Sequence, residues 1–332
     1  MATLKDVAKL ANVDVSTVSR ALNNKSYVHP ETKKKIYQAV EALGYMPNII
    51  AKSLHQGKRQ TIGVVVPSIN FSLFGDIVLG IEEEARKQGF SVLVCNTLDD
   101  PEIEMDYLNR LRNGLVDGII IAGTGENNRL LYDIRSTNIA ILQIIRKQDK
   151  RIDSVVADFY ECGYRSVEFL AKLGCQKIAF INGPMAIAPY KERYNGYKKA
   201  LRKNSLEEYT FESDLTGAQH FEEGFQVTNK FLQEIPGLDG VMTALDMQGL
   251  GALRAIKKAG LSIPQDIRLI SLTGHSIGGY LETAMTSIEI PAVEMGIHTT
   301  KKLIELIQTI EKEKICLQHD VFQSKLIERE TT

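Results

Sequence analysis

Short apolar runs rich in β-branched residues alternate with amphipathic helical patterns across residues 62–272 of this 332-residue chain. The predicted strands are 62–67, 91–95, 117–122, 139–144, 177–182, 240–243 and 268–272. The predicted helices are 74–88, 102–115, 162–172, 192–203, 221–232 and 247–259. Strands that alternate with helices form parallel sheets covered on both faces. The stretch exceeds one such sheet with ordinary loops, so we predict an α/β body with two lobes.

The residues before this body predict a small all-helical unit. Apolar residues share one face of a first helix, namely Leu4, Val7, Ala8 and Ala11. Thr3 is placed to cap that helix, and 12–14 is a turn of residues that tolerate unusual backbone angles. A third helix over 30–43 opens with Pro30 and Glu31, which favour helix entry. Its inner face is Ile36, Ala39, Val40 and Leu43.

The second helix, 15–22, has Val18, Ala21 and Leu22 facing inward. Its outward side chains are Val15, Ser16, Ser19 and Arg20. Short side chains let a helix approach the DNA major groove closely, and arginine makes bidentate contacts with guanine. Two short helices joined by a tight turn are typical of a helix-turn-helix unit that reads DNA. The alternative is three helices of an ordinary bundle with a solvated face.

Charge is divided unevenly along the chain. Residues 1–59 contain ten Lys or Arg and four Asp or Glu, whereas the whole chain has a formal net charge of −1. The first sixty residues are therefore basic and the rest is acidic. A basic unit on an acidic body favours attraction of the unit to nucleic-acid phosphates.

Three segments together resemble the lac/galactose repressor family of bacterial transcription regulators. They are TLKDVAKLANVDVSTVSRALNN at 3–24, HPETKKKIYQAVEALGYMPN at 29–48 and AKSL at 51–54. A looser match continues to about residue 290. The resemblance implies base contacts from Val15, Ser16 and Arg20. It implies a DNA-binding set of Thr3, Val15, Ser16, Thr17, Ser19, Arg20, Asn23, Tyr27, Val28, Asn48, Ala51 and Leu54.

Residues 45–54 predict a second DNA element. Pro47 ends the third helix and can begin a new one that is too short to be stable alone. By resemblance, paired hinge helices of a dimer enter the minor groove, and Leu54 wedges between base steps. Such a wedge kinks DNA at a cost of roughly a few kcal/mol that added contact area offsets. The alternative is that Leu54 packs against the body.

The sequence thus predicts a DNA-binding domain at 1–46, a hinge and linker at 47–60 and an effector-binding, dimerisation domain at 61–332. The resemblance implies a periplasmic-binding-protein-like body that the chain crosses three times. The crossings fall near Asp158, near 287–291 and near Leu317. They divide the body into an N-lobe (about 61–158 and 291–317) and a C-lobe (about 159–288 and 318–332).

Ligands of open parallel sheets bind beyond the carboxyl ends of the strands, so the cleft between lobes is the predicted effector site. By resemblance, Arg193 at the start of a helix and Asp246 after a strand hydrogen-bond the ligand. The remaining predicted contacts are Asn70, Phe71, Phe74, Thr273 and His275. The alternatives are a surface role for Arg193, an N-cap for Asp246, and lobe core for the two phenylalanines.

Two departures from the family pattern concern this cleft. The family usually carries an aspartate, a common sugar ligand, within the stretch that here reads 271–274, Ser-Leu-Thr-Gly. Ile145 also replaces an acidic residue that often precedes the arginine matching Arg146. The cleft is therefore less acidic than a typical sugar site. A sugar, a sugar phosphate, another anion and no small ligand at all stay open, as does a phosphoprotein corepressor.

The function we predict is a dimeric, cytoplasmic transcriptional regulator, most simply a repressor of carbohydrate-utilisation genes, bound to a near-palindromic operator. The alternatives are a catabolite-type regulator with a phosphoprotein corepressor and a sugar-binding module without a regulatory role. No cofactor, metal spacing or membrane-spanning run is evident. Ser276 lies in a Gly-x-Ser-x-Gly run that is a poor elbow, so we expect no enzyme. The cysteines predict buried, reduced thiols. They are Cys95, Cys162, Cys175 and Cys316.

Overall fold

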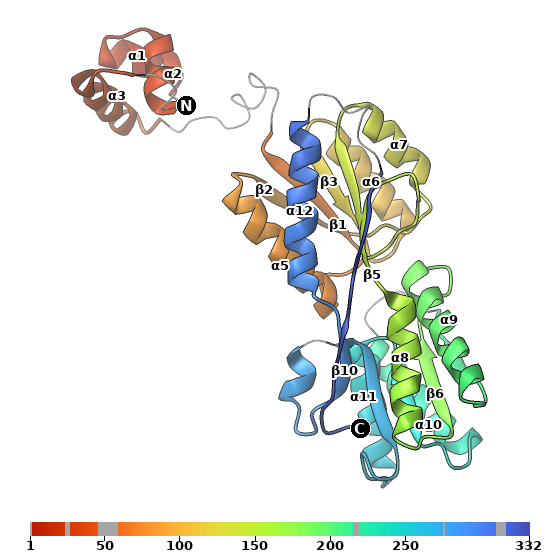
Figure 1. The fold of residues 1–332 in the computed structure, drawn as a ribbon. Helices are drawn as coiled ribbons and strands as arrows, with labels where there is room; N and C mark the ends of the chain where they lie inside the picture. Colours follow the sequence, from red (N-terminus) through yellow and green to blue (C-terminus); the bar gives the residue numbers. More distant parts are fainter. Residues whose placement is uncertain (1, 24–26, 46–58, 215–218, 275, 310–316) are drawn as a thin grey trace. The chain divides into compact units, whose positions relative to one another are not determined.

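The computed structural model describes residues 2–23, 27–45, 59–214, 219–274, 276–309 and 317–332. They divide into two units, a head over residues 1–59 and a body over residues 60–332. Figure 1 shows the three helices of the head and the strands and helices of the body. None of the helices in the described residues is long and apolar enough to span a bilayer.

The head has the predicted helices, α1 Leu4–Ala11, α2 Val15–Asn23 and α3 Pro30–Ala42. Thr3 and Asp6 form a capping box that satisfies backbone groups at the start of α1. Asn12 ends α1 in the left-handed region, with φ 54°, which an asparagine adopts more readily than most residues. Val7, Val18 and Ile36, fully buried, come from the three helices and meet in one core, so the inward faces are confirmed.

The N-lobe contains β1 Thr61–Val66, α5 Ser72–Lys87, β2 Ser91–Asn96, α6 Pro101–Arg112, β3 Gly118–Ile121, α7 Asn128–Ser136, β4 Ala140–Ile144, β5 Ser154–Ala157, α12 Ala292–Gln308 and β11 His319–Phe322. Its strands form one parallel sheet in the order β11-β5-β4-β3-β1-β2. Along β1, Val64 and Val66 join one hydrophobic cluster and Val65 joins another. The sheet is therefore covered on both faces, as predicted.

The C-lobe repeats this plan. It contains α8 Phe159–Lys172, β6 Ile178–Asn182, α9 Ala188–Lys203, β7 Tyr209–Glu212, α10 His220–Glu234, β8 Gly240–Thr243, α11 Asp246–Lys258, β9 Arg268–Gly274, the 3-10 helix η1 Ser276–Tyr280, β10 Thr286–Glu289 and β12 Lys325–Ile327. The sheet order is β12-β10-β9-β8-β6-β7, parallel except for the pair β10 and β12. Two hydrophobic clusters again lie in this lobe.

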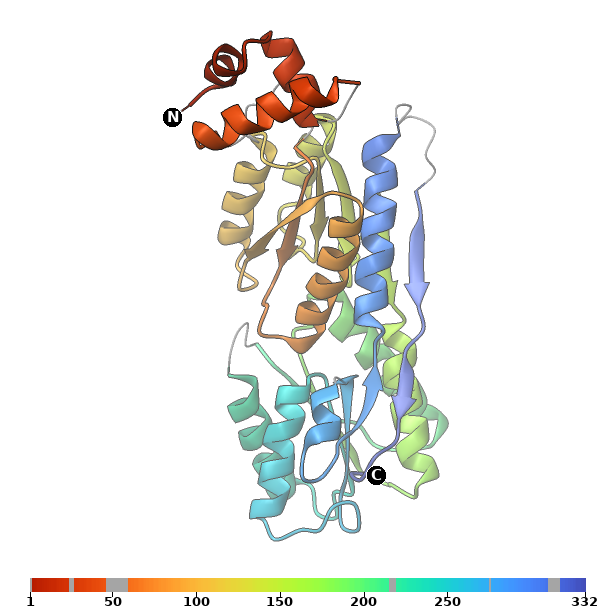
Figure 2. The same cartoon turned by 90° about the vertical axis from the view of Figure 1, so that its left-hand side faces the viewer.

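The chain passes between the lobes three times, and the third position differs from the predicted one. The first two crossings lie between β5 and α8, at Asp158, and between β10 and α12. The prediction of a third near Leu317 is wrong, because β11 pairs with β5 and extends the N-lobe sheet. The crossing lies between Phe322 and Lys325, so residues 318–322 belong to the N-lobe. Figure 2 shows the last strands running along α12 from one lobe to the other.

Three helix pairs of the body cross where a glycine on each helix meets the backbone of the other. The pairs are Gly80 with Gly296 (α5 and α12), Gly163 with Gly196 (α8 and α9), and Gly224 with Gly251 (α10 and α11). A Cβ built on Gly163 would lie 2.0 Å from the carbonyl oxygen of Arg193, and one on Gly224 would lie 2.1 Å from that of Gln248. Any side chain there would force the helices apart.

The cysteines within the described residues are free thiols buried in the body, as predicted: Cys95, Cys162 and Cys175. Burial raises the pKa of Cys95 and of Cys175 to about 11. Cys316 lies outside the described residues.

Candidate functional site

The exposed face of α2 carries the predicted base-reading residues. Val15 is 41% exposed, and Ser16 and Arg20 are exposed beside it. The Arg20 side chain lies back along the helix, with Nε donating to the Ser16 carbonyl and Nη2 to the Ser16 hydroxyl, both at 3.3 Å. Both contacts are solvent-exposed, so the guanidinium can exchange them for contacts with another molecule.

The other predicted DNA contacts of the head differ in their exposure to solvent. Tyr27 is 83% exposed, whereas Val28 is half-buried against the head core. Thr17 and Ser19 are half-buried on α2, and Thr3 is occupied by the capping box. The Asn23 side chain, Asn48, Ala51 and Leu54 lie outside what the structure describes.

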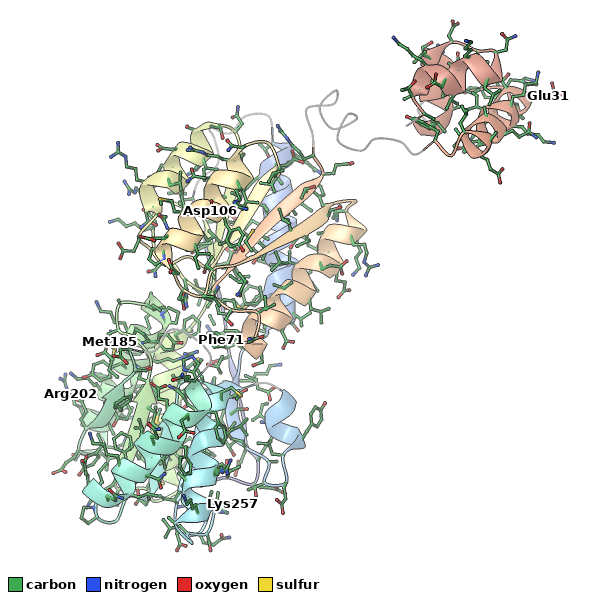
Figure 3. All side chains as sticks on the ribbon, turned by 180° about the vertical axis from the view of Figure 1, so that it is seen from behind. Glu31, Phe71, Asp106, Met185, Arg202 and Lys257 are labelled. Carbon is green, nitrogen blue, oxygen red and sulfur yellow. The ribbon has the colours of Figure 1, made fainter. Side chains whose placement is uncertain are left out.

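A cavity of about 150 Å³ lies between the two lobes of the body. Its walls include six of the seven predicted effector contacts: Asn70, Phe71, Phe74, Arg193, Asp246 and Thr273. The seventh, His275, is outside the described residues. Phe74 is both wall and core, since it is 4% exposed and belongs to the N-lobe cluster. Phe71 lies where the two lobes meet (Figure 3).

Arg193 is the largest fully buried side chain of the cavity wall. Its helix begins at Ala188, so the prediction that Arg193 starts a helix is wrong; Pro189, tolerated in a first turn, lets α9 begin earlier. Its guanidinium donates to the carbonyls of Ala244 and Leu272 and, at 3.1 Å, to the Thr273 hydroxyl. Nε has no hydrogen-bond partner among the described residues. Burial lowers the pKa of Arg193, so a further polar partner would stabilise its charge.

Asp246 is the first residue of α11 rather than its N-cap, so the capping alternative is wrong. It is 6% exposed, and its Oδ1 accepts a hydrogen bond of 2.5 Å from the Ser271 hydroxyl. Ser271 belongs to β9, so neighbouring elements hold the carboxylate at the cavity. Thr273 on the same strand donates to the Ala244 carbonyl.

A strained turn brings Ile145 and Arg146 to the cavity at the end of β4. Ile145 has φ 63°, a conformation that a β-branched residue rarely adopts, and the Arg146 amide donates to the Ile144 carbonyl at 2.6 Å. This is the rare γ-turn. The Arg146 guanidinium makes a buried two-point ion pair with Asp99, which balances its charge. Arg146 therefore needs no ligand anion to neutralise it.

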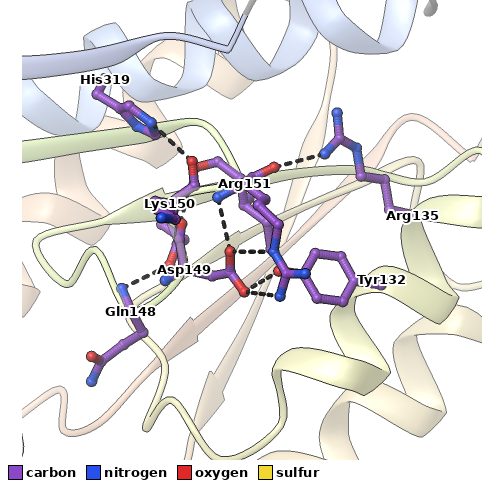
Figure 4. A network of polar contacts seen from close by, with 9 residues as sticks. Tyr132, Arg135, Gln148, Asp149, Lys150, Arg151 and His319 are labelled. Carbon is purple, nitrogen blue, oxygen red and sulfur yellow. Dashed lines mark hydrogen bonds and ion pairs between the residues drawn. The ribbon is translucent and has the colours of Figure 1, made fainter.

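The loop after this turn is held by a polar network (Figure 4). Asp149 accepts hydrogen bonds from Tyr132 and Arg151, and the Arg151 guanidinium stacks 4.3 Å from the Tyr132 ring centre. The hydrogen bonds from Arg151, then that from Tyr132, hold the pKa of Asp149 well below its usual value although burial opposes them. His319 of β11 joins through Ser154 and the Lys150 carbonyl. The network ties the loop to β11.

The sequence prediction left several cavity residues unnamed, and one of them, His220, carries a polar ring. His220, the first residue of α10, is 5% exposed and lines the cavity. Its ring lies 5.2 Å from that of Phe71 on the opposite lobe. A lone histidine carries no periodic pattern, so periodicity could not single it out.

Neither metal nor nucleophile chemistry finds support in the described residues. No group of three or more His, Cys, Asp or Glu side chains there is arranged to hold a metal ion. Ser276 of the Gly-x-Ser-x-Gly run begins η1, a 3-10 helix of five residues, whereas a nucleophile elbow requires an α-helix after the serine.

Known protein families match both the head and the body. Residues 3–48 match the family described as bacterial regulatory proteins, lacI family, and residues 59–325 match periplasmic binding proteins and sugar binding domain of LacI family. The ribose operon repressor of Halalkalibacterium halodurans is 33% identical over 100% of this chain and 97% of its own length. The PurR repressor of Actinobacillus pleuropneumoniae serotype 3 is 31% identical over 99% and 98%.

Solved structures of this kind of protein superpose on the chain. The lac repressor dimer bound to operator and the anti-inducer ONPF superposes with a TM-score of 0.87, at 26% identity over 99% of this chain and 98% of that one. A periplasmic binding protein/LacI transcriptional regulator from Alkaliphilus metalliredigens QYMF, complexed with D-xylulofuranose, gives a TM-score of 0.74 at 29% identity over 82% and 99%. This chain therefore belongs to the LacI family of bacterial regulatory proteins.

Proposed function

We propose that this LacI-family regulator represses transcription by binding a near-palindromic operator as a dimer, and that a neutral sugar in the cleft controls that binding. The observation that carries the proposal is the coexistence of two built surfaces in one chain. One is the exposed α2 face around Arg20. The other is the cavity in which the Nε of buried Arg193 has no hydrogen-bond partner within the part of the chain that the structure describes. The ligand would bind one of two states of the body more tightly, and these two states would differ in their affinity for the operator.

For DNA, we assign base reading to Val15, Ser16 and Arg20. Arg20→Ala should weaken specific operator binding by about 1–3 kcal/mol and leave non-specific binding nearly unchanged. The matched control is Lys34→Ala on the exposed side of α3, which should weaken binding to all sequences alike through phosphate contacts. Fluorescence anisotropy with operator and scrambled duplexes measures both. Equal loss on the two duplexes after Arg20→Ala would remove the base-reading role.

The hinge proposal rests on the resemblance of 45–54 to the family. Leu54→Ala should lower specific affinity and reduce DNA bending, because an apolar wedge unstacks a base step. Bending is measured by energy transfer between dyes at the ends of the duplex. Unaltered bending would show that Leu54 is no wedge.

The dimer proposal is supported by the edge of the N-lobe sheet. β2 is an edge strand, and its neighbouring residues Leu93 and Val94 are 41% and 40% exposed, although they point to opposite faces. Leu79 on α5 is 57% exposed. Exposed apolar edges invite pairing, and a second copy would cover them. Helices α5 and α11 are the ones we expect at that interface.

A neutral ligand is favoured by the balance of charge in the cavity. Arg146 is neutralised by Asp99, and the Arg193 cation is accompanied by the Asp246 carboxylate. A phosphate or carboxylate would add an uncompensated negative charge in a mostly apolar cavity, which is unfavourable. Hydroxyl groups, in contrast, can accept from Arg193 and donate to Asp246. The printed names of relatives, a ribose operon repressor and a complex with D-xylulofuranose, point to the same ligand class.

The test is a thermal-shift and anisotropy screen of the full chain with D-ribose, D-xylulose and cellobiose against D-ribose 5-phosphate. A sugar at a hundred times its Kd should stabilise the folded body by about 2.7 kcal/mol. Arg193→Lys should abolish the stabilisation and the effect on operator binding. Arg202→Lys, exposed on the same helix, should change neither. Stabilisation only by the phosphate would contradict the neutral class.

A further inference from the structure

His220 combines two properties that seldom occur together. It is buried at the cavity wall, and its Nε2 has no hydrogen-bond partner among the described residues. A buried acceptor or donor without a partner is destabilising, so a histidine kept only for packing would normally have both ring nitrogens bonded. The other ring nitrogen, Nδ1, faces Glu223 Oε2 at 3.5 Å.

The groups around Glu223 determine which ring nitrogen carries the proton. Gln248, fully buried, accepts from the Leu245 amide through Oε1 and donates through Nε2 to Glu223 Oε2 at 2.9 Å. Only this orientation of the amide satisfies both neighbours. Burial raises the pKa of Glu223, but hydrogen bonds from His220, Ser213 and Gln248 outweigh it and the net effect lowers the pKa. Ionised Glu223 only accepts, so Nδ1 of His220 must donate.

We propose that His220 contacts the cleft ligand through Nε2, which accepts a hydrogen bond from a hydroxyl or N–H group of the ligand while Nδ1 donates to Glu223, itself held by Gln248. The proposal rests on the proposed function, because it names one contact within the same cleft. It adds a requirement on the ligand, since the group that reaches His220 must be a donor and cannot be a carboxylate or a doubly ionised phosphate. The His220 ring contacts Phe71 of the other lobe, so the proposed hydrogen bond to the ligand lies where the lobes meet.

The tautomer is tested without any ligand. Two-bond ¹H–¹⁵N spectra of the full chain with labelled histidine distinguish a protonated Nδ1 from a protonated Nε2, and His220→Phe identifies the signal. We expect the Nδ1–H form in the wild type. Glu223→Met removes the acceptor at Nδ1, so the preference for the Nδ1–H form should be lost. Glu222→Gln, an exposed neighbour on α10, should leave the form unchanged. A wild-type Nε2–H form would overturn the proposal.

The contact is tested by titration calorimetry of the full chain with D-ribose, D-xylulose and cellobiose. His220→Phe keeps an aromatic ring against Phe71 and removes the acceptor, so it should weaken the sugar that binds by roughly tenfold. Glu223→Met should weaken it too, because the Nδ1–H form loses its acceptor. Equal affinity in wild type and His220→Phe would refute the contact. If no sugar binds, the proposed ligand class fails, while an Nδ1–H spectrum still supports a donor ligand.

Discussion

The crossing of α8 and α9 offers a stringent test of how the cavity is held. Gly163→Ala would place a Cβ 2.0 Å from the Arg193 carbonyl oxygen, a distance that real Cβ contacts do not show, and 2.9 Å from the carbonyl carbon. The obstructing atoms are backbone, so no rotamer change relieves them. The helices must separate by about 1 Å to restore contact distance. Overpacking of this kind costs about 1–3 kcal/mol.

Part of this loss is offset by the higher helix propensity of alanine, about 1 kcal/mol. We expect the upper end of the overpacking range because the contact is so short, which leaves a net destabilisation of about 2 kcal/mol. Thermal unfolding of the full chain should then shift down by about 5 °C. Because Arg193 moves with its carbonyl, sugar affinity should fall as well.

Gly75→Ala on α5 is the matched control. The nearest atom to its new Cβ would be the Ile69 carbonyl oxygen at 3.8 Å, an ordinary contact. That variant should be neutral or more stable by up to about 1 kcal/mol. A Gly163→Ala protein as stable as the wild type, or a Gly75→Ala protein equally destabilised, would refute the packing argument.

Three further outcomes follow from other parts of the chain. Asp149→Asn should flatten the acid side of the stability profile: the depressed pKa of Asp149 contributes stability above about pH 4 that is lost as pH falls, and urea unfolding at pH 3–7 measures the slope. Val94→Lys should shift the dimer toward monomer in sedimentation velocity, whereas Lys87→Arg, an exposed cation on α5, should not. Thr3→Ala should destabilise α1 by about 0.5–2 kcal/mol through loss of the capping box, read as faster amide exchange there; unchanged exchange would contradict the cap.

Sequence patterns predicted the elements that have strong periodicity. The strand 240–243 was predicted with its observed bounds, and the helices of the head were placed within two residues of theirs. The prediction left out α7, β5, β7, β10 and α12, and it also left out the last two strands. β11 and β12 are short, partly exposed strands that pair with distant segments, so nothing local marks them or the crossing between them.

Resemblance to the family predicted where the cleft lies, but it predicted few of the contacts that determine the chemistry of the cleft. Arg193 and Asp246 could be placed because family motifs surround them. The partners that define their environment, such as the Ser271 hydroxyl or the Ala244 carbonyl, come from other strands and are brought close only by folding. The sequence prediction missed His220 because its proposed role depends on its contact with Glu223 and on Gln248, which lies on a different helix.

The segment 317–332 has a consequence for synthesis of the regulator. It supplies β11 to one sheet and β12 to the other, and Thr331 then bonds to Leu269 with its hydroxyl and its carbonyl. A ribosome that has made residues 1–316 has made the whole head but neither finished lobe. Prematurely stopped chains would therefore carry a DNA-binding head on a body open at two sheet edges, which favours proteolysis and aggregation over promoter occupancy.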